Sequence, residues 1–273
     1  MKNKIIYWIL ALVITIIAAF YQKTTGPSYE KRQKVNIDGQ EYKLKLVRSI
    51  SLDEKSEIVL KIPASNVTGK LIYRRYPTNE EWQTADFTRE TRVEESVLVA
   101  PVPAQPPAGK IEYYFELANG TETVIVNKDK PVIIRYKGAV PGIILIPHIF
   151  LIFFAMLLSN YTGLIAVKKD ERYRYYTIIT VIFMAVGGMT LGPVVQKYAF
   201  GELWTGIPKG WDLTDNKTLI GFASWVIALI FNLKKERPYL VWIAALITLL
   251  IFSIPHSIFG SQLDPSTGKL IQA

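Results

Sequence analysis

Hydrophobic residues are concentrated in five stretches of the chain, and each stretch contains few or no charged residues. A helix needs roughly 20 apolar residues to cross the hydrocarbon layer of a membrane. The candidate membrane spans are Ile5–Tyr21, Val140–Val167, Tyr175–Tyr198, Leu219–Leu233 with its flanks, and Tyr239–Ile258. The pattern therefore predicts an integral membrane protein, a membrane α-helical bundle of about five transmembrane helices.

Between the first two stretches the pattern changes to short alternating runs rich in Val, Ile and Tyr. The runs are Tyr42–Val47, Ile58–Ile62, Lys70–Arg75, Val97–Val102, Ile111–Leu117 and Thr123–Val126. Asp38-Gly39 and Asn119-Gly120 are typical of hairpin turns. Strands of this length and spacing predict an inserted all-β sandwich of the immunoglobulin or fibronectin type III kind.

These patterns divide the chain into four parts. We expect an N-terminal transmembrane anchor at residues 1–22, an extracytoplasmic β-sandwich at 23–139, a four-helix membrane core at 140–260 and an extracytoplasmic tail at 261–273. A cleavable signal peptide is the alternative for the first stretch, but no small-x-small cleavage site follows it cleanly. We therefore interpret this stretch as an uncleaved anchor.

Basic residues flank the hydrophobic stretches in three short groups. The groups are Lys2 and Lys4, then Lys168, Lys169, Arg172 and Arg174, and then Lys234, Lys235 and Arg237. Since Lys and Arg are in excess in cytoplasmic loops, all three groups are predicted to be cytoplasmic. The expected location is the cytoplasmic (inner) membrane, in contact with membrane lipid. The N-terminus then lies inside, and the β-sandwich and the C-terminus lie outside.

Charge and cysteine content exclude several kinds of function. The net charge of +9 would fit nucleic-acid binding. The membrane-flanking groups account for much of this charge, so no nucleic-acid partner is expected. Cysteine is absent from the sequence, which excludes disulfides, thiolate metal sites and thiol catalysis in this chain.

The β-sandwich shows no candidate catalytic group. Trp82 is interpreted as a packing residue. The carboxylate pairs Glu80-Glu81 and Glu94-Glu95 lie in turn-like polar segments and are interpreted as solvated surface. We therefore assign no catalysis to this domain.

Both histidines of the chain, His148 and His256, lie near the predicted outer ends of their membrane stretches. Ionisable groups at this depth are rare unless they are functional or paired. A proline precedes each histidine, and the backbone acceptors that it frees offer a purely structural partner for the ring. Because both histidines are predicted to lie in one layer below the outer surface, a shared site is favoured.

An outward polar segment, residues 200–218, lies between the two histidines in the sequence. It carries Trp204 and Trp211, and Asp212 is a good capping residue for the helix that follows. This order of a histidine-bearing span, a tryptophan-rich loop and a second histidine-bearing span resembles the tryptophan-rich (WWD) heme-handling proteins of cytochrome c maturation. The resemblance covers residues 140–260.

The resemblance implies a bound heme, with His148 and His256 as its axial ligands and metal-binding residues. It also implies that Trp204, Trp211 and Asp212 cradle the cofactor. A heme iron accepts imidazole nitrogens, and indole rings stack on an apolar disc of this size.

The expected function is heme handling or heme binding at the outer face, for cytochrome assembly or electron transfer. The β-sandwich would then recruit a protein partner such as an apocytochrome or a membrane complex. The alternative is a non-catalytic accessory subunit of a membrane complex, whose β-sandwich binds a protein partner and whose histidines are structural. Neither alternative assigns a reaction to the chain.

Overall fold

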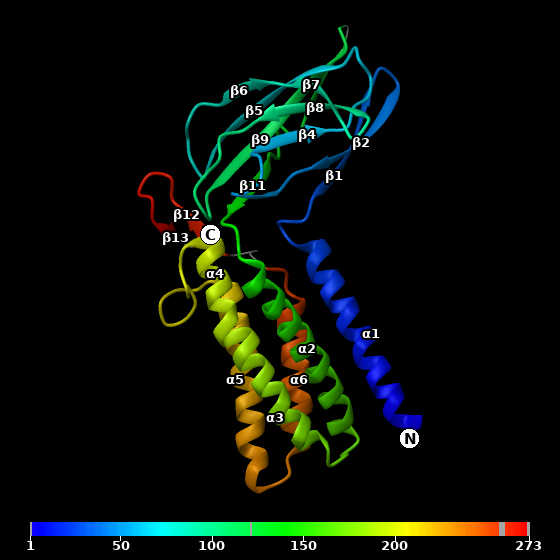
Figure 1. The fold of residues 1–273 in the computed structure, drawn as a ribbon, viewed down its shortest axis with the longest axis vertical. Helices are drawn as coiled ribbons and strands as arrows, with labels where there is room; N and C mark the ends of the chain where they lie inside the picture. Colours follow the sequence, from blue (N-terminus) through cyan, green and yellow to red (C-terminus); the bar gives the residue numbers. More distant parts are fainter. Residues whose placement is uncertain (1, 121, 257–259, 272–273) are drawn as a thin grey trace. The chain divides into compact units, whose positions relative to one another are not determined.

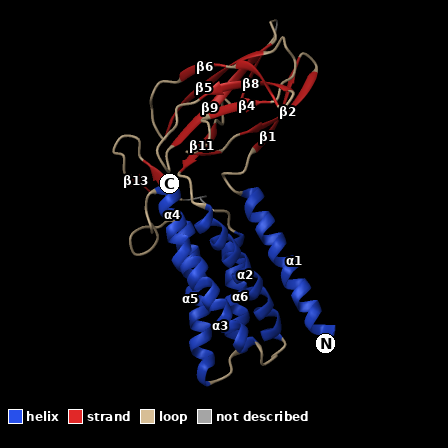
Figure 2. Cartoon of the chain, in the orientation of Figure 1, coloured by secondary structure: helices blue, strands red, loops and turns tan. Residues whose placement is uncertain are grey.

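The computed structural model describes residues 2–120, 122–256 and 260–271, which form two compact units. The helical unit contains the chain up to Pro27 and from Val140 to Gly260. The β unit contains Ser28–Ala139 and also Ser261–Ile271. Figure 2 shows that the helices and the main strands belong to separate segments of the chain. Helical segments and a β domain are therefore both present, as the sequence predicts.

The helices of the helical unit run alongside one another (Figure 1). They are α1 (Lys2–Thr25), α2 (Gly142–Val167), α3 (Tyr173–Phe183), the π-helix η1 (Met184–Leu191), α4 (Gly192–Phe200), α5 (Leu213–Lys234) and α6 (Pro238–Ser253). Because α3, η1 and α4 follow one another directly, they form one continuous apolar segment, Tyr173–Phe200.

Within the described residues, four segments are long and apolar enough to cross a membrane: α1, α2, α3 to α4, and α5. Helix α6 is apolar but shorter, with 16 residues. It ends at Ser253, whereas the sequence predicts a span to Ile258, which lies outside the described residues. Length and composition thus indicate a multi-pass membrane protein, as the sequence predicts.

Small residues set the distance between α2 and its neighbours. A Cβ atom added at Gly163 of α2 would lie 2.5 Å from the Cβ of Ala245 in α6. A Cβ atom at Gly187 of η1 would lie 2.7 Å from the Cβ of Leu151. Only glycine permits these approaches, which is the usual way in which membrane helices pack closely.

Aromatic and polar contacts hold the other helices to this packed centre. Trp8 of α1 stacks on Tyr161 of α2 with ring centroids 3.8 Å apart. Trp225 of α5 is fully buried and donates a hydrogen bond of 2.9 Å to the hydroxyl of Thr248 in α6. Trp225 therefore packs between helices, where its indole N–H is satisfied.

The β unit consists of short strands. They are β1 (Lys31–Ile37), β2 (Gln40–Leu46), β3 (Ser49–Ser51), β4 (Glu57–Leu60), β5 (Thr68–Tyr76), β6 (Gln83–Asp86), β7 (Thr88–Arg92), β8 (Glu95–Pro101), β9 (Lys110–Ala118), β10 (Thr123–Val126), β11 (Val132–Lys137), β12 (Gln262–Leu263) and β13 (Leu270–Ile271). The turn predicted at Asp38-Gly39 joins β1 to β2, and both residues have positive φ.

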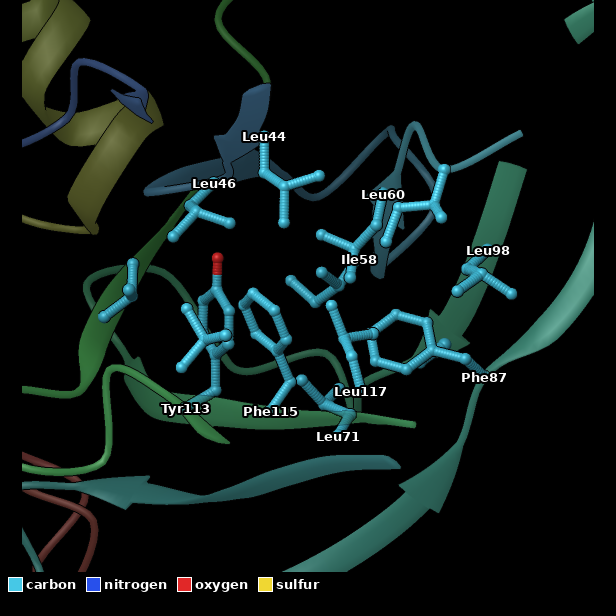
Figure 3. Packing of buried hydrophobic residues seen from close by; sticks show 14 of the residues in the cluster. Leu44, Leu46, Ile58, Leu60, Leu71, Phe87, Leu98, Tyr113, Phe115 and Leu117 are labelled. Carbon is cyan, nitrogen blue, oxygen red and sulfur yellow. The ribbon is translucent and has the colours of Figure 1, made fainter. Parts of the chain in front are cut away.

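The strands form a mostly antiparallel arrangement. The largest sheet has the order β3-β11-β9-β5-β6, with β10 also paired to β9, and β3 and β11 run parallel. A second sheet has the order β4-β8-β7, and β1 pairs with β2. Side chains from these sheets share one hydrophobic core. In Figure 3, Leu44 of β2 and Ile58 of β4 face Phe115 and Leu117 of β9.

The segment after Gly260 contributes a small hairpin, β12 and β13, to the β unit. The amide of Leu263 donates a hydrogen bond of 3.1 Å to the carbonyl of Ala108. Lys110 donates one of 2.6 Å to the side-chain oxygen of Gln262. Burial, together with nearby Arg135, lowers the pKa of Lys110 to about 8. The sequence predicts a separate tail here, but residues 261–271 are held by the β unit.

Candidate functional site

The start of α5 is formed by an acidic cap. Asp212 precedes the helix, and its Oδ1 accepts hydrogen bonds from the amides of Thr214 at 2.8 Å and Asp215 at 3.4 Å. These amides have no partner inside the helix, so the carboxylate satisfies them. The structure therefore gives Asp212 the capping role that its sequence position predicts.

Asp215 holds the preceding loop against α5. Its Oδ2 accepts hydrogen bonds from the amides of Thr205 at 2.6 Å and Gly206 at 3.0 Å. Gln196 of α4 donates to the same oxygen at 3.0 Å. Asn216 adds a contact, since its Oδ1 accepts from the amide of Ile207 at 2.8 Å. The backbone of the tryptophan-bearing loop is thus tied to the first turn of α5.

The two loop tryptophans lie in different surroundings. The indole N–H of Trp204 donates a hydrogen bond of 3.0 Å to the carbonyl of Ile207, so it serves the loop itself. The side chain of Trp211 is largely exposed, at 69%. The predicted role of these indoles as a heme cradle remains a prediction.

The ring of His148 packs against two glycines, Gly187 of η1 and Gly192 of α4. Its Nδ1 lies 2.9 Å from the carbonyl oxygen of Gly187 in η1. A Cβ atom added at Gly192 would lie 3.8 Å from the Cε1 of the ring. Because a carbonyl oxygen only accepts, Nδ1 carries the proton, and Nε2 keeps its lone pair. This is the tautomer that binds a metal through Nε2.

Lys217 is the most unusual residue at this end of the helical unit. It lies in α5, is 2% exposed, and donates a hydrogen bond of 2.7 Å to the carbonyl of Ile254. Its Nζ also lies 3.5 Å from Nδ1 of His256. A long cationic side chain in a membrane-spanning helix is costly and usually marks function.

The two histidines come from different helices to the same end of the helical unit. His148 belongs to α2, and His256 follows the end of α6. The His148 ring lies against the carbonyl of Gly187, and the His256 ring lies against the ammonium of Lys217. Of these groups, Lys217 and His256 are in direct contact. A site shared by His148, His256 and Asp212 remains a prediction.

A heme at this end of the helical unit remains a prediction, and its two predicted ligands differ in how well they suit it. The described residues contain no group of three or more His, Asp or Glu side chains arranged to hold a metal ion. A heme already supplies four nitrogens and needs only two axial ligands. His148 has the required tautomer. His256 fits less well, because an ammonium only donates and the Lys217 contact assigns its Nδ1 the accepting role.

Sequence reasoning missed two residues that organise this end. Lys217 lies in a polar run just before a hydrophobic stretch, so its sequence position predicts a solvent-exposed side chain on the helix surface. Asp215 passes for a second capping residue. A signal for Lys217 does exist, since a cation near the N-terminal end of a helix opposes the positive end of the helix dipole.

The β unit has a separate groove of about 530 Å³. Its lining includes Arg74, Trp82 and Gln105. The guanidinium carbon of Arg74 lies 4.4 Å from the centroid of the Trp82 ring, and Trp82 meets Tyr114 edge to face at 5.1 Å. Arg74 also pairs with Glu112 at 2.6 Å. Trp82 thus packs within the β unit and also lines a concave surface.

Comparisons with known proteins do not assign the chain to a family. No protein-family model matches the sequence, no curated protein matches it, and no solved structure matches the fold.

Proposed function

We propose that this chain is a membrane heme-handling protein with His148 and His256 as the axial ligands of a porphyrin at one end of its helices. The observation that carries this proposal is that both histidines reach the same end of the helical unit. In this proposal the helical unit is a transmembrane bundle, and the β unit is a sandwich of the immunoglobulin or fibronectin type III kind.

The residues of this end would have distinct roles. His148, oriented by the Gly187 carbonyl, would bind iron through Nε2. His256 would be the second ligand once its ring leaves Lys217, because that contact keeps Nε2 protonated. The loop tied by Asp215 would cover the site. A heme bound here would supply an iron centre capable of one-electron transfer or of delivery to an apocytochrome. We propose this function on the chemistry of the residues and on the resemblance to WWD proteins.

The absorption spectrum of the purified full-length protein tests this function. We expect a Soret band as isolated, or after addition of hemin to the heme-free protein. Replacing His148 or His256 by Ala should lower or shift the band, because each change removes one axial ligand. Trp82→Ala in the β unit is the control and should leave the spectrum unchanged. If the purified protein takes up no hemin, the proposed function is wrong.

The proposed orientation is tested separately. Trp8 stacks on Tyr161 near the end of α2, and Gln22 reaches the carbonyl of Phe252 near the end of α6. The start of α1 therefore lies at the end of the unit where the basic loops lie. We propose that this end is cytoplasmic.

The cysteine-free chain permits a labelling test of this orientation. The single substitutions Lys169→Cys and Lys209→Cys are each treated with an impermeant thiol reagent on intact cells. Labelling only at position 209 is expected. Labelling only at position 169 would show that the orientation is the opposite of the one proposed.

The groove on the β unit favours a second candidate, an accessory subunit of a membrane complex. A concave surface with an Arg over a Trp ring has the residue types that dominate protein interfaces. Under this alternative the protein shows no Soret band, and Trp82→Ala releases a stably associated subunit. Retention of that subunit by the variant would count against the groove as its binding site.

A further inference from the structure

A groove lies between the end of α2 and the start of α6, and we call it the α2–α6 groove. It has a volume of about 600 Å³ and is lined by Ala166, Val167, Lys169, Pro238, Tyr239 and Trp242. Ala166 is buried, whereas Val167, Tyr239 and Trp242 are between 40% and 58% exposed. The wall of the groove is therefore mostly apolar, and it is open to the surroundings of the helices. For a membrane helix those surroundings are lipid.

The groove lies where the apolar helices give way to basic loops. Helix α2 ends at Val167 and α6 begins at Pro238. The adjoining segments 168–174 and 234–237 contain seven basic and three acidic residues. The tyrosine and the tryptophan of the groove are residue types enriched at the boundary between membrane and water. The groove thus has an apolar wall on the helix side and a surplus of positive charge on the loop side.

Lys169 is the cation of the groove itself. Its side chain is exposed. The arginines of the neighbouring loop are paired, Arg172 with Asp170 at 2.5 Å and Arg174 with Glu236 at 3.6 Å. The ion pairs found among the described residues do not include Lys169. An anionic group above the apolar wall would therefore meet an ammonium that is not engaged by a carboxylate.

The backbone at Lys169 does not require a lysine. Its φ of 55° is left-handed, and its amide donates a hydrogen bond of 3.0 Å to the carbonyl of Ala166. The amide of Asp170 donates one of 3.1 Å to the carbonyl of Ile165. These two bonds end α2 in the manner that most often places glycine at the left-handed position. Replacing Lys169 by Gly should therefore remove the ammonium and keep the end of the helix intact.

We propose that the α2–α6 groove binds an anionic phospholipid, with the headgroup on Lys169 and an acyl chain along Val167 and Trp242. A cation beside an apolar wall at the membrane boundary complements a negatively charged headgroup joined to a hydrocarbon chain, and basic pockets between membrane helices take such headgroups. A zwitterionic phospholipid fills the apolar part equally well, but its own cation offsets the charge of its phosphate. This inference is independent of the histidines and of any heme.

Native mass spectrometry of the full-length protein in detergent tests the proposal. The protein is mixed with equal amounts of phosphatidylglycerol and phosphatidylcholine that carry the same acyl chains, so the apolar contribution cancels in the ratio of the two bound lipids. We expect the wild type to favour phosphatidylglycerol roughly fivefold, the effect of one lysine near an anionic lipid. In Lys169→Gly the ratio should fall close to one. The thermal midpoint of this variant should not fall, because glycine adopts positive φ without strain.

Three further variants make the result specific to the groove. Lys235→Gln removes an exposed charge at the same end outside the groove and should keep the wild-type ratio. Lys169→Arg keeps the charge and should also keep it. Trp242→Ala shortens the apolar wall and should lower the occupancy of both lipids. A wild type without preference overturns the proposal. An equal loss of preference in Lys169→Gly and Lys235→Gln also overturns it, because the attraction would then belong to the whole basic end.

Discussion

Lys217 donates a hydrogen bond of 2.7 Å to the carbonyl oxygen of Ile254, which joins the first part of α5 to the residue that follows α6. The contact places a cation beside the segment that carries His256. The same lysine therefore has two opposing effects on stability: its hydrogen bond holds the end of α6 in place, and its buried charge costs free energy.

Replacing Lys217 by Met shows which of these two effects is larger. Met has a similar length but no charge, and removal of an unpaired buried charge gains more than the loss of one hydrogen bond to a neutral carbonyl. We therefore expect the thermal midpoint of the heme-free protein in detergent to rise by a few degrees in this variant. Circular dichroism of the helices provides the measurement. A clear fall, absent from the exposed control Lys209→Met, would show that Lys217 is a structural tie.

Replacing Asp215 by Ala should release the loop between α4 and α5. The change removes the acceptor of two backbone amides, Thr205 and Gly206, and charge-assisted hydrogen bonds of this kind are worth about 1.5–3 kcal/mol each. Hydrogen exchange of these amides should accelerate strongly. Glu202→Ala in the same loop is a matched control, because Glu202 is exposed. Unchanged protection of Gly206 in the Asp215 variant would contradict the assignment.

Gly163→Ala should destabilise the helical unit. The new Cβ would lie 2.5 Å from the Cβ of Ala245, and neither atom belongs to a flexible side chain that can turn away. Helices α2 and α6 must therefore separate, at a cost of about 1–3 kcal/mol. Gly142→Ala on the same helix is the control, since the nearest atom to its Cβ is 3.8 Å away. Thermal unfolding in detergent should distinguish the two, and equal midpoints would argue against close packing at Gly163.

The β unit should become more stable as the pH rises from about 8 to 10.5. Burial lowers the pKa of Lys110 from 10.5 to about 8, so in this range the folded state binds fewer protons than the unfolded state. The stabilising contribution is complete above pH 10.5 and is lost as the pH falls through about 8. Urea unfolding of the wild type and Lys110→Met at both ends of this range isolates the effect. A pH dependence that is the same in both proteins would show that other groups cause it.

Several features of the protein follow from local sequence alone. Long apolar stretches predict the membrane helices because each must satisfy its own backbone hydrogen bonds in lipid. Asp38-Gly39 predicts the β1–β2 hairpin because both residues tolerate positive φ. Asp212 predicts the start of α5 because its short carboxylate reaches the free amides of the first turn.

Only the tertiary structure decided where distant residues meet. The pairing of Lys217 with Ile254 and His256 joins α5 to the end of α6, and the Lys110–Gln262 contact joins β12 to β9 within the β unit. The π-helix that presents the Gly187 carbonyl to His148 likewise depends on packing against α2. The sequence determines which segments are apolar, because that property is local. It leaves open which buried polar groups become partners, because such a partner is chosen by the packing of residues far apart in the chain.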